Sequence, residues 1–216
     1  YNTAKEQAVD IFCFGTSVIG MPGTSEIELR NTQKHLDSVE CFTGKVEGRE
    51  AVRSFYFKPN RFGTSIALWK KVFSRATLVE AINKINPPAP LRYGQDLIQL
   101  VVTMLHTNSI YIDNTIKLHK YFLGAGGTQQ GKNMLAMSNF ERILTTKNSL
   151  LCIQQYLEAH PEDEETEKRI IKHVTNTYLP TCTGNYWYLK DEDMLDGFKK
   201  LYNIWGEEIY TTPFFY

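Results

Sequence analysis

The pattern of hydrophobic and polar positions divides this chain of 216 residues into a short strand-like start and a long helical remainder. Residues 9–20, VDIFCFGTSVIG, are rich in β-branched and aromatic types and lead into the turn-forming sequence GMPG. This composition predicts a strand followed by a turn. Ser25 and Glu28 then form a capping-box pattern, which predicts a short helix running to about Val39.

The glycines that follow predict a hairpin. Gly44 and Gly48 bracket it, and its arms are residues 39–42 and 51–57. Since the later pattern does not favour strands, we expect β-structure in the N-terminal quarter alone.

From Thr64 onward the pattern is helical almost without interruption. A first helix begins at Thr64 and ends before the proline-rich connector at residues 86–90, because proline cannot continue a helix. The later helices are predicted over residues 95–106, 113–123, 132–146, 149–159, 162–178 and 191–205. In the last helix, the apolar positions expected to face inward are Leu195, Phe198, Leu201, Tyr202 and Trp205.

These elements predict a mostly α fold, with a small β-containing N-terminal part packed on a bundle-like helical body; an α+β fold is the alternative. The proline-rich connector predicts a boundary between a mixed part, residues 1–86, and a helical body, residues 91–216. Both parts can also belong to one compact domain.

The charges change this picture because they are unevenly distributed, although the net charge is zero. Residues 49–157 hold fourteen basic and five acidic residues, whereas the two flanks carry the acidic surplus. A basic middle can bind a polyanion, pair with the acidic ends of another copy, or fold against the ends of its own chain.

The basic middle begins with a segment, residues 49–75, in which cations alternate with aromatic rings. Single-stranded nucleic acid is bound by this combination, since cations hold phosphates and rings stack on unpaired bases. The expected phosphate contacts are Arg53, Lys58, Arg61, Lys70, Lys71 and Arg75, the expected stacking residues are Tyr56 and Phe57, and Lys117, Lys120 and Lys132 would extend the groove.

Helical spacing predicts that two other rings of this segment, Trp69 and Phe73, do not stack on bases. With the helix starting near Ile66, Trp69 and Phe73 fall on the apolar side, and Lys70 and Lys71 fall on the polar side. Trp69 is therefore expected in the core. The alternative for the whole segment is that its rings are core and its cations are a solvated face.

A glycine-rich loop offers a second alternative. Residues Gly126–Lys132 match the spacing of a phosphate-binding loop, G-x-x-x-x-G-K, which would make the protein a nucleotide-binding or phosphate-handling enzyme. Asn133, however, stands where that pattern requires a serine or threonine to hold Mg²⁺.

Other catalytic or metal chemistry is not selected by any spacing. The four cysteines include no C-x-x-C pair, although two disulfides are compatible with their number. Cys152 is expected in the core and Cys182 in a loop where it could react. Asp191, Asp193 and Asp196 are interpreted as the start of a helix. We assign no catalytic residue, metal or cofactor.

The aromatic residues Tyr210, Phe214, Phe215 and Tyr216 end the sequence and predict docking in a groove of the same molecule or of a neighbouring subunit.

No window is apolar enough to span a membrane, and no N-x-[ST] sequon occurs, so an intracellular location, cytoplasmic or nuclear, is favoured, with secretion left open. The start at Tyr1 predicts a fragment or a processed product.

Together these features predict a non-enzymatic protein that assembles with itself and binds single-stranded RNA or DNA through its basic middle. The first alternative is a helical protein–protein interaction module that binds no nucleic acid. The second is the phosphate-handling enzyme that would use the loop at Gly126–Lys132.

Overall fold

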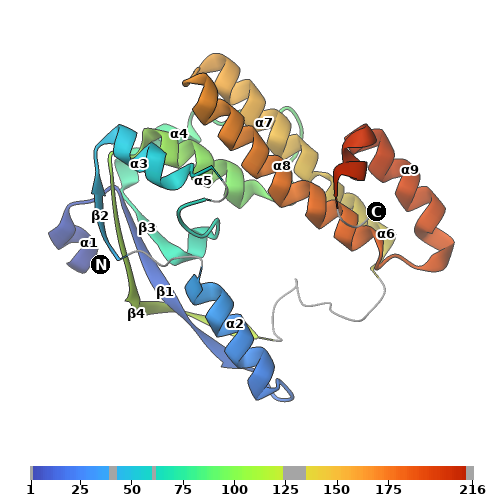
Figure 1. The fold of residues 1–216 in the computed structure, drawn as a ribbon, viewed down its shortest axis with the longest axis horizontal. Coiled ribbons are helices and arrows are strands. Elements are labelled where there is room, and N and C mark those ends of the chain that lie inside the picture. The colour runs from blue at the N-terminus through green and yellow to red at the C-terminus, as the bar shows by residue number, and fades with distance from the viewer. Residues whose placement is uncertain (1, 39–42, 60–61, 124–134, 213–216) are drawn as a thin grey trace. The chain divides into compact units, whose positions relative to one another are not determined.

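A computed structural model describes residues 2–38, 43–59, 62–123 and 135–212 (Figure 1). The chain forms two compact units, which are described separately. Unit 1 comprises residues 1–84 and 99–129, and unit 2 comprises residues 85–98 and 130–216. The described residues are mostly helical with a small sheet, so the prediction of a mostly α fold with some β-structure is confirmed.

Unit 1 is built on a mixed four-stranded sheet with the strand order β2-β4-β1-β3. The strands are β1 (Ile11–Gly20), β2 (Gly44–Glu47), β3 (Lys71–Phe73) and β4 (Ser109–Leu123). β1 runs parallel to β4, and β2 and β3 pair antiparallel with β4 and β1. The helices with residues in unit 1 are α1 (Asn2–Gln7), α2 (Glu26–Ser38), α3 (Arg49–Tyr56), α4 (Arg75–Ile82) and the shared α5 (Gln95–His106).

The predicted strand, capping box and central helix of this unit are confirmed. The side chains of β1 from Ile11 to Phe14 are buried. Ser25 Oγ accepts from the backbone N–H of Glu28 at 3.2 Å, and Glu28 Oε2 accepts from the backbone N–H of Ser25 at 3.2 Å, so the first turn of α2 is closed. The predicted helix 95–106 is α5, whose apolar residues are buried on nearly every side.

The predicted helix 113–123 is wrong, because this segment belongs to β4. Asp113 stands at the start of that predicted helix, but its Oδ1 accepts from the backbone N–H of Thr115 at 2.9 Å within β4. This bond closes a bulge: Phe14 pairs with Asp113, and the next residue, Gly15, pairs with Lys117. Strand pairing with β1, about a hundred residues earlier, therefore overrides the local pattern.

The predicted helix from Thr64 is wrong in its first half. The chain forms a short 3₁₀ helix, η1 (Leu68–Lys70), then β3, and only then α4. The predicted hairpin is also wrong, because residues 51–56 lie in α3 and β2 pairs with β4. Its first arm, residues 39–42, lies outside the described residues.

Unit 2 is helical in its described part. It contains α6 (Met137–Leu144), α7 (Thr146–Ala159), α8 (Glu164–Tyr186), α9 (Met194–Trp205) and the 3₁₀ helices η2 (Asp191–Asp193) and η3 (Gly206–Thr211). Two i,i+4 ion pairs stabilise the first turns of α8, with Lys168–Glu164 at 2.6 Å and Arg169–Glu165 at 2.9 Å. α8 continues through Pro180, eight residues beyond its predicted end.

The inward face predicted for α9 is only partly correct. Leu201 and Trp205 are buried, but Tyr202 is exposed and Leu195 is 67 % exposed. Among the described residues, we find no helix with the length and hydrophobicity needed to span a bilayer.

Candidate nucleic-acid interface

The two rings predicted to stack on bases lie inside unit 1. Tyr56 and Phe57 are 0 % and 1 % exposed. The Tyr56 ring centroid is 4.9 Å from that of Phe57 and 5.0 Å from that of Phe62. Since these rings pack on each other, they offer no face to an external base in this conformation, as the core alternative anticipated.

Two of the predicted phosphate-binding lysines are also buried. Lys70 is 1 % exposed, and its Nζ donates to the backbone oxygen of Leu36 at 3.2 Å. Lys71 Nζ donates to the backbone oxygens of Ala67, at 3.1 Å, and of Ser65. Both ammonium groups donate hydrogen bonds to backbone oxygens inside unit 1 and are not surface cations.

The remaining predicted cations are scattered. Arg53 is largely buried and pairs with Glu50 at 3.3 Å. Lys58 Nζ lies 4.5 Å from the centroid of the Phe55 ring, and Arg75 is exposed at the first turn of α4. Arg61, Lys132 and the loop Gly126–Lys132 lie outside the described residues.

Trp69, which was expected in the core, is instead exposed. Its side chain is 38 % exposed, and its ring centroid lies 4.2 Å from that of His119 and 6.1 Å from that of Tyr121. Because Trp69 and Lys70 lie in the 3₁₀ helix η1 and Lys71 begins the extended strand β3, this segment is not the predicted α-helix, and its inward and outward positions are exchanged. Trp69 is thus an exposed ring held by stacking on β4.

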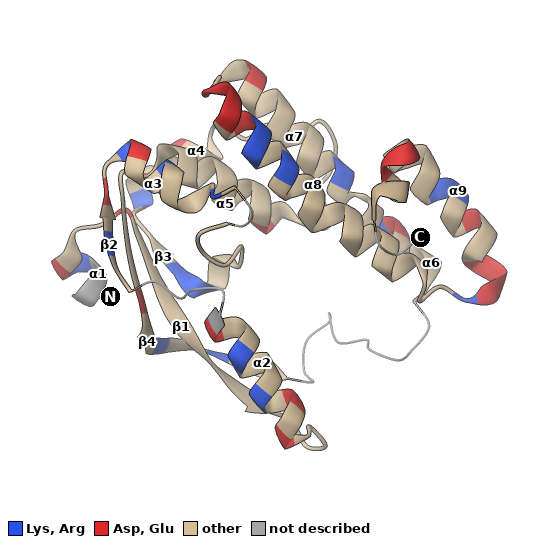
Figure 2. Ribbon diagram, viewed as in Figure 1, with Lys and Arg blue, Asp and Glu red and all other residues tan. Residues whose placement is uncertain are grey.

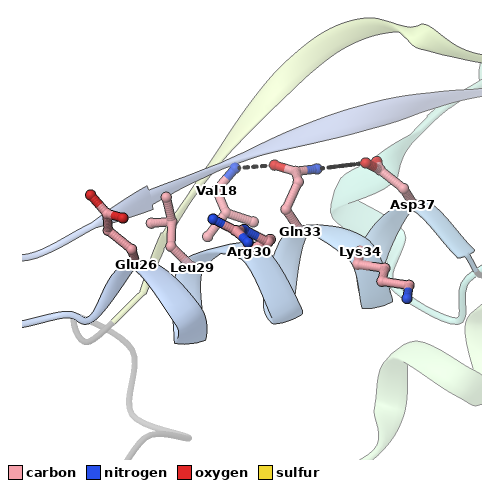
Figure 3. Close-up of a pocket in the computed structure, with 7 residues that line it drawn as sticks. All are labelled: Val18, Glu26, Leu29, Arg30, Gln33, Lys34 and Asp37. Carbon is pink, nitrogen blue, oxygen red and sulfur yellow. Dashed lines mark hydrogen bonds between the residues drawn. The ribbon is translucent and has the colours of Figure 1, made fainter.

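A pocket of about 860 Å³ lies along α2 beside β1 (Figure 3). Its floor is apolar and its rim is charged, as is common in ligand sites. We call it the α2 pocket, and it is lined by Val18, Glu26, Leu29, Arg30, Gln33, Lys34 and Asp37.

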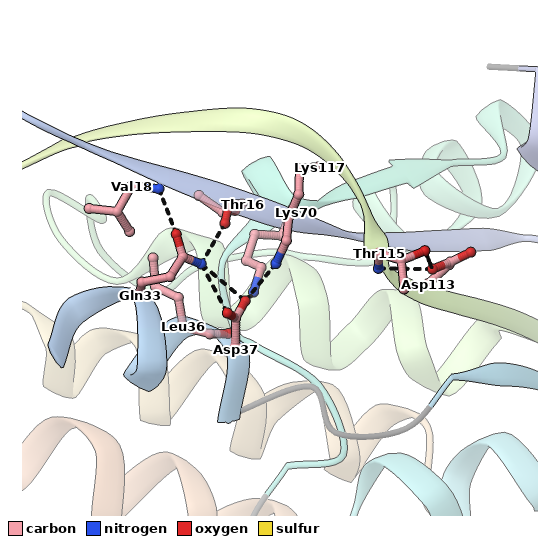
Figure 4. A network of polar contacts seen from close by, with 9 residues as sticks. All are labelled: Thr16, Val18, Gln33, Leu36, Asp37, Lys70, Asp113, Thr115 and Lys117. Atoms are coloured by element: carbon pink, nitrogen blue, oxygen red, sulfur yellow. Dashed lines mark hydrogen bonds and ion pairs between the residues drawn. The ribbon is translucent and has the colours of Figure 1, made fainter. Parts of the chain in front are cut away.

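Gln33 fixes α2 to the edge of β1 (Figure 4). Its side-chain oxygen accepts from the backbone N–H of Val18 at 2.8 Å, and its Nε2 donates to the backbone oxygen of Thr16 at 2.9 Å. The carboxamide therefore makes the two bonds that a neighbouring strand would make beyond the end of β3. This positions the helix that carries the cations of the pocket.

A second contact joins α2 to β4 across β1. Lys117 Nζ lies 2.6 Å from Asp37 Oδ1, and the Gln33 Nε2 lies 3.1 Å from the same carboxylate. The Lys117 side chain passes over Gly15, where an added Cβ would lie 2.6 Å from Lys117 Cδ and 2.4 Å from Asn114 O. Glycine is therefore required at this crossing.

The charges of the pocket are only partly compensated within the chain. Arg30 and Lys34 are exposed one turn apart on α2 and form no ion pair with any residue that the structure describes. Asp37 is paired with Lys117, and Glu26 lies in the first turn of α2, where the helix dipole stabilises a carboxylate. The part of the pocket that lies along the C-terminal half of α2 therefore carries a net positive charge.

Trp69 lies close to the same end of α2, because the next residue, Lys70, donates to Leu36 in the last turns of that helix. Below it, burial and the nearby charge of Lys70 lower the pKa of His119. The imidazole is therefore neutral at physiological pH and provides a flat ring against Trp69. Lys120 pairs with Ser17, so it faces away from Val18 and the pocket.

Nucleophilic and metal chemistry receive no support from the described residues. Cys182 was expected in a loop, but it lies in α8 and is buried, and burial raises the pKa of its thiol to about 11. At neutral pH it is a protonated core residue. Within the described ranges, no three histidine, cysteine or acidic side chains are grouped as metal ligands.

Arg30 and Lys34 do not stand out in the distribution of charge along the sequence, because they lie within the first 48 residues, which are acidic in sum. The signal was available in the predicted helix itself. The i,i+4 spacing of Arg30 and Lys34 places both cations on one side of that helix.

Comparisons with known proteins were made for the whole chain. No protein-family model matches it, and no curated protein matches it.

Proposed function

We propose that unit 1 binds single-stranded nucleic acid at the α2 pocket, and that Trp69 takes part from the segment 49–75 in place of Tyr56 and Phe57. Arg30 and Lys34 contact successive phosphates, and Trp69 stacks on an unpaired base. The observation that carries this proposal is that both cations project from one side of α2 without an acidic partner among the described residues.

The pocket supports a single strand better than a duplex. Its apolar floor, formed by Val18 and Leu29, accommodates a base or sugar, and the exposed ring of Trp69 is already held flat by His119. Bases of a duplex are stacked on each other and offer no free face, whereas unpaired bases stack on protein rings. Sequence preference is not expected, because phosphates and ring faces are common to all nucleotides.

Fluorescence anisotropy of labelled single-stranded RNA and DNA tests the proposal. The wild-type chain should bind both, and log Kd should rise with log salt concentration. Arg30→Ala and Lys34→Ala should each weaken binding and lower the magnitude of the salt slope by about 0.7 per lost phosphate contact. Trp69→Leu should cost about 1–3 kcal/mol of binding free energy.

Lys199→Ala is the matched control, because it removes an exposed lysine of unit 2 and changes the net charge by the same amount. It should leave the affinity within error of wild type. Absence of binding at low salt, or equal losses in all three lysine and arginine variants, would contradict the assignment of the α2 pocket.

A further inference from the structure

Helix α9 of unit 2 carries a second apolar face besides the one that it buries. Leu201 and Trp205 are 0 % and 2 % exposed and form the buried face. Leu195, Phe198 and Tyr202 have the spacing i, i+3, i+7, which places them together on the side of the helix that adjoins the buried face. Leu195 and Tyr202 are exposed there.

Aromatic contacts extend this face onto the end of α8. Trp187 is 52 % exposed, and its ring centroid lies 5.1 Å from that of Tyr186. The Tyr186 centroid lies 6.2 Å from that of Phe198, which in turn lies 6.2 Å from that of Tyr202 with the two rings nearly parallel. We call Trp187, Leu195, Phe198 and Tyr202 the α9 ridge. Exposed clusters of large apolar residues mark protein interfaces, where Trp and Tyr contribute most of the binding energy.

The charges around the α9 ridge are mixed, with acidic residues gathered at its η2 end and the exposed Lys199 next to Leu195 and Tyr202 on α9. η2 contributes Asp191, Glu192 and Asp193, and Figure 2 shows acidic residues at the start of α9. Asp191 and Asp193 form no ion pair with the described part of the chain. The partner of the ridge should therefore carry cations where it meets η2, next to an apolar contact.

Unit 1 has the complementary surface. By sequence, unit 1 holds 14 basic and 10 acidic residues, and unit 2 holds 10 basic and 14 acidic residues. On α2, Ile27, Arg30 and Lys34 share one side at the spacing i, i+3, i+7, and Ile27 is 70 % exposed. This side, which we call the α2 face, combines an apolar residue with two cations that have no acidic partner among the described residues.

From this complementarity we infer that the α9 ridge of one molecule docks on the α2 face of a second copy of the same chain. Two different surfaces meet, so the contact is heterologous, and a pair of docked molecules keeps one unused α2 face on the first molecule and one unused ridge on the second. Such contacts extend into rings or open chains of subunits and do not stop at a symmetric dimer. The inference does not depend on nucleic-acid binding, although both use Arg30 and Lys34.

A mixing experiment tests the head-to-tail contact in the full chain, with sedimentation velocity as the measurement. Wild type should form species larger than a dimer as the protein concentration rises, and added salt should dissociate them. Trp187→Ala combined with Tyr202→Ala removes the ridge, and Arg30→Glu combined with Lys34→Glu reverses the α2 face. Each double variant alone should be monomeric, with self-association weakened about tenfold or more.

Mixing the two double variants should restore association, but only to a dimer of one molecule of each. The ridge is intact in one variant and the α2 face is intact in the other, so one contact can form and no further subunit can add. Leu118→Ala, which removes an exposed apolar side chain of β4 outside both surfaces, is the control and should assemble like wild type.

Three results would overturn the inference. The first is a wild-type chain that is monomeric at every concentration tested, and the second is a ridge variant that assembles like wild type. The third is a mixture of the two folded double variants that stays monomeric. Circular dichroism of each variant establishes that loss of assembly is not loss of folding.

Discussion

At the scale of single residues, three consecutive positions explain why the proposed nucleic-acid interface differs from the one predicted from the sequence. Trp69, Lys70 and Lys71 were assigned to helix faces, which put the tryptophan inside and the lysines outside. The chain is 3₁₀-helical and then extended here, so the tryptophan is exposed and the lysines are buried as donors to backbone oxygens. The sequence identifies cations next to aromatic rings in this segment. Which of these side chains face the solvent depends on the pairing of β3 with β1, and no local pattern contains that information.

Replacing Gly15 should destabilise unit 1 at the crossing of β1 and the Lys117 side chain. Gly15→Ala should lower the free energy of unfolding by about 1–3 kcal/mol, because its Cβ would overlap the backbone oxygen of Asn114 and the stem of Lys117. Urea denaturation measures the change. Ser17→Ala, two residues along β1 in a half-buried position, is the control and should have a smaller effect. Equal effects of the two substitutions would contradict the close crossing at Gly15.

His119 should make stability depend on pH. Its pKa is lowered in the folded state by burial and by Lys70, whereas in the unfolded chain it is about 6.5. Below that pH the unfolded chain binds more protons than the folded one, so stability falls as the pH decreases toward the folded pKa. His119→Phe keeps a ring against Trp69 and removes this titration.

Urea denaturation of wild type and His119→Phe, at about pH 7.5 and about pH 5.5, measures this contribution. The wild type should lose more stability than the variant over this interval, and other titrating groups cancel in the comparison. An identical pH dependence of the two proteins would show that the imidazole is not held neutral by its surroundings.

At the scale of elements, prediction succeeded where local signals suffice. The capping box of α2 and the uniformly apolar helix α5 lie where the sequence placed them. β4 was predicted as a helix, because its pairing partner β1 lies about a hundred residues earlier and its bulge at Asp113 resembles a helix cap. The α2 pocket could be anticipated as a cationic helix side, but the contact of Gln33 with β1 could not.

Gln33→Ala tests whether α2 is held by the edge of β1. The change leaves the backbone N–H of Val18 and the backbone oxygen of Thr16 without their side-chain partner, which should cost about 1 kcal/mol or more. Hydrogen exchange at the Val18 amide should become faster. Asn31→Ala, an exposed substitution on the same helix, should leave that exchange rate unchanged. Slow exchange at Val18 in the Gln33 variant would show that another group protects this amide.

At the scale of the whole molecule, the neutral net charge conceals two units of opposite sign. The basic unit carries the α2 face, and the acidic unit carries the α9 ridge. In the two proposals, carboxylates around the ridge and phosphates of a polymer are alternative anions for Arg30 and Lys34. The two proposals therefore make the molecule an assembling protein whose contacts with itself and with nucleic acid exclude each other at the same helix.

Competition follows from this overlap. Adding single-stranded RNA to the assembled wild-type chain should lower the observed sedimentation coefficients to those of RNA-bound monomers. The reason is that RNA and the ridge of a second copy would use the same cations of α2. The ridge variant, Trp187→Ala with Tyr202→Ala, should bind RNA at least as tightly as wild type, since its α2 face is never occupied by another copy. Larger assemblies on RNA that still require the ridge would contradict a shared surface.

The most direct test of the central claim is to map where single-stranded RNA touches the chain, by ultraviolet crosslinking of a photoreactive oligonucleotide followed by peptide mass spectrometry. If the α2 pocket is the interface, crosslinks should appear at Trp69 and on the peptide that contains α2, and they should disappear in the Arg30→Glu, Lys34→Glu variant. Crosslinks confined to unit 2, or none at low salt, would contradict it.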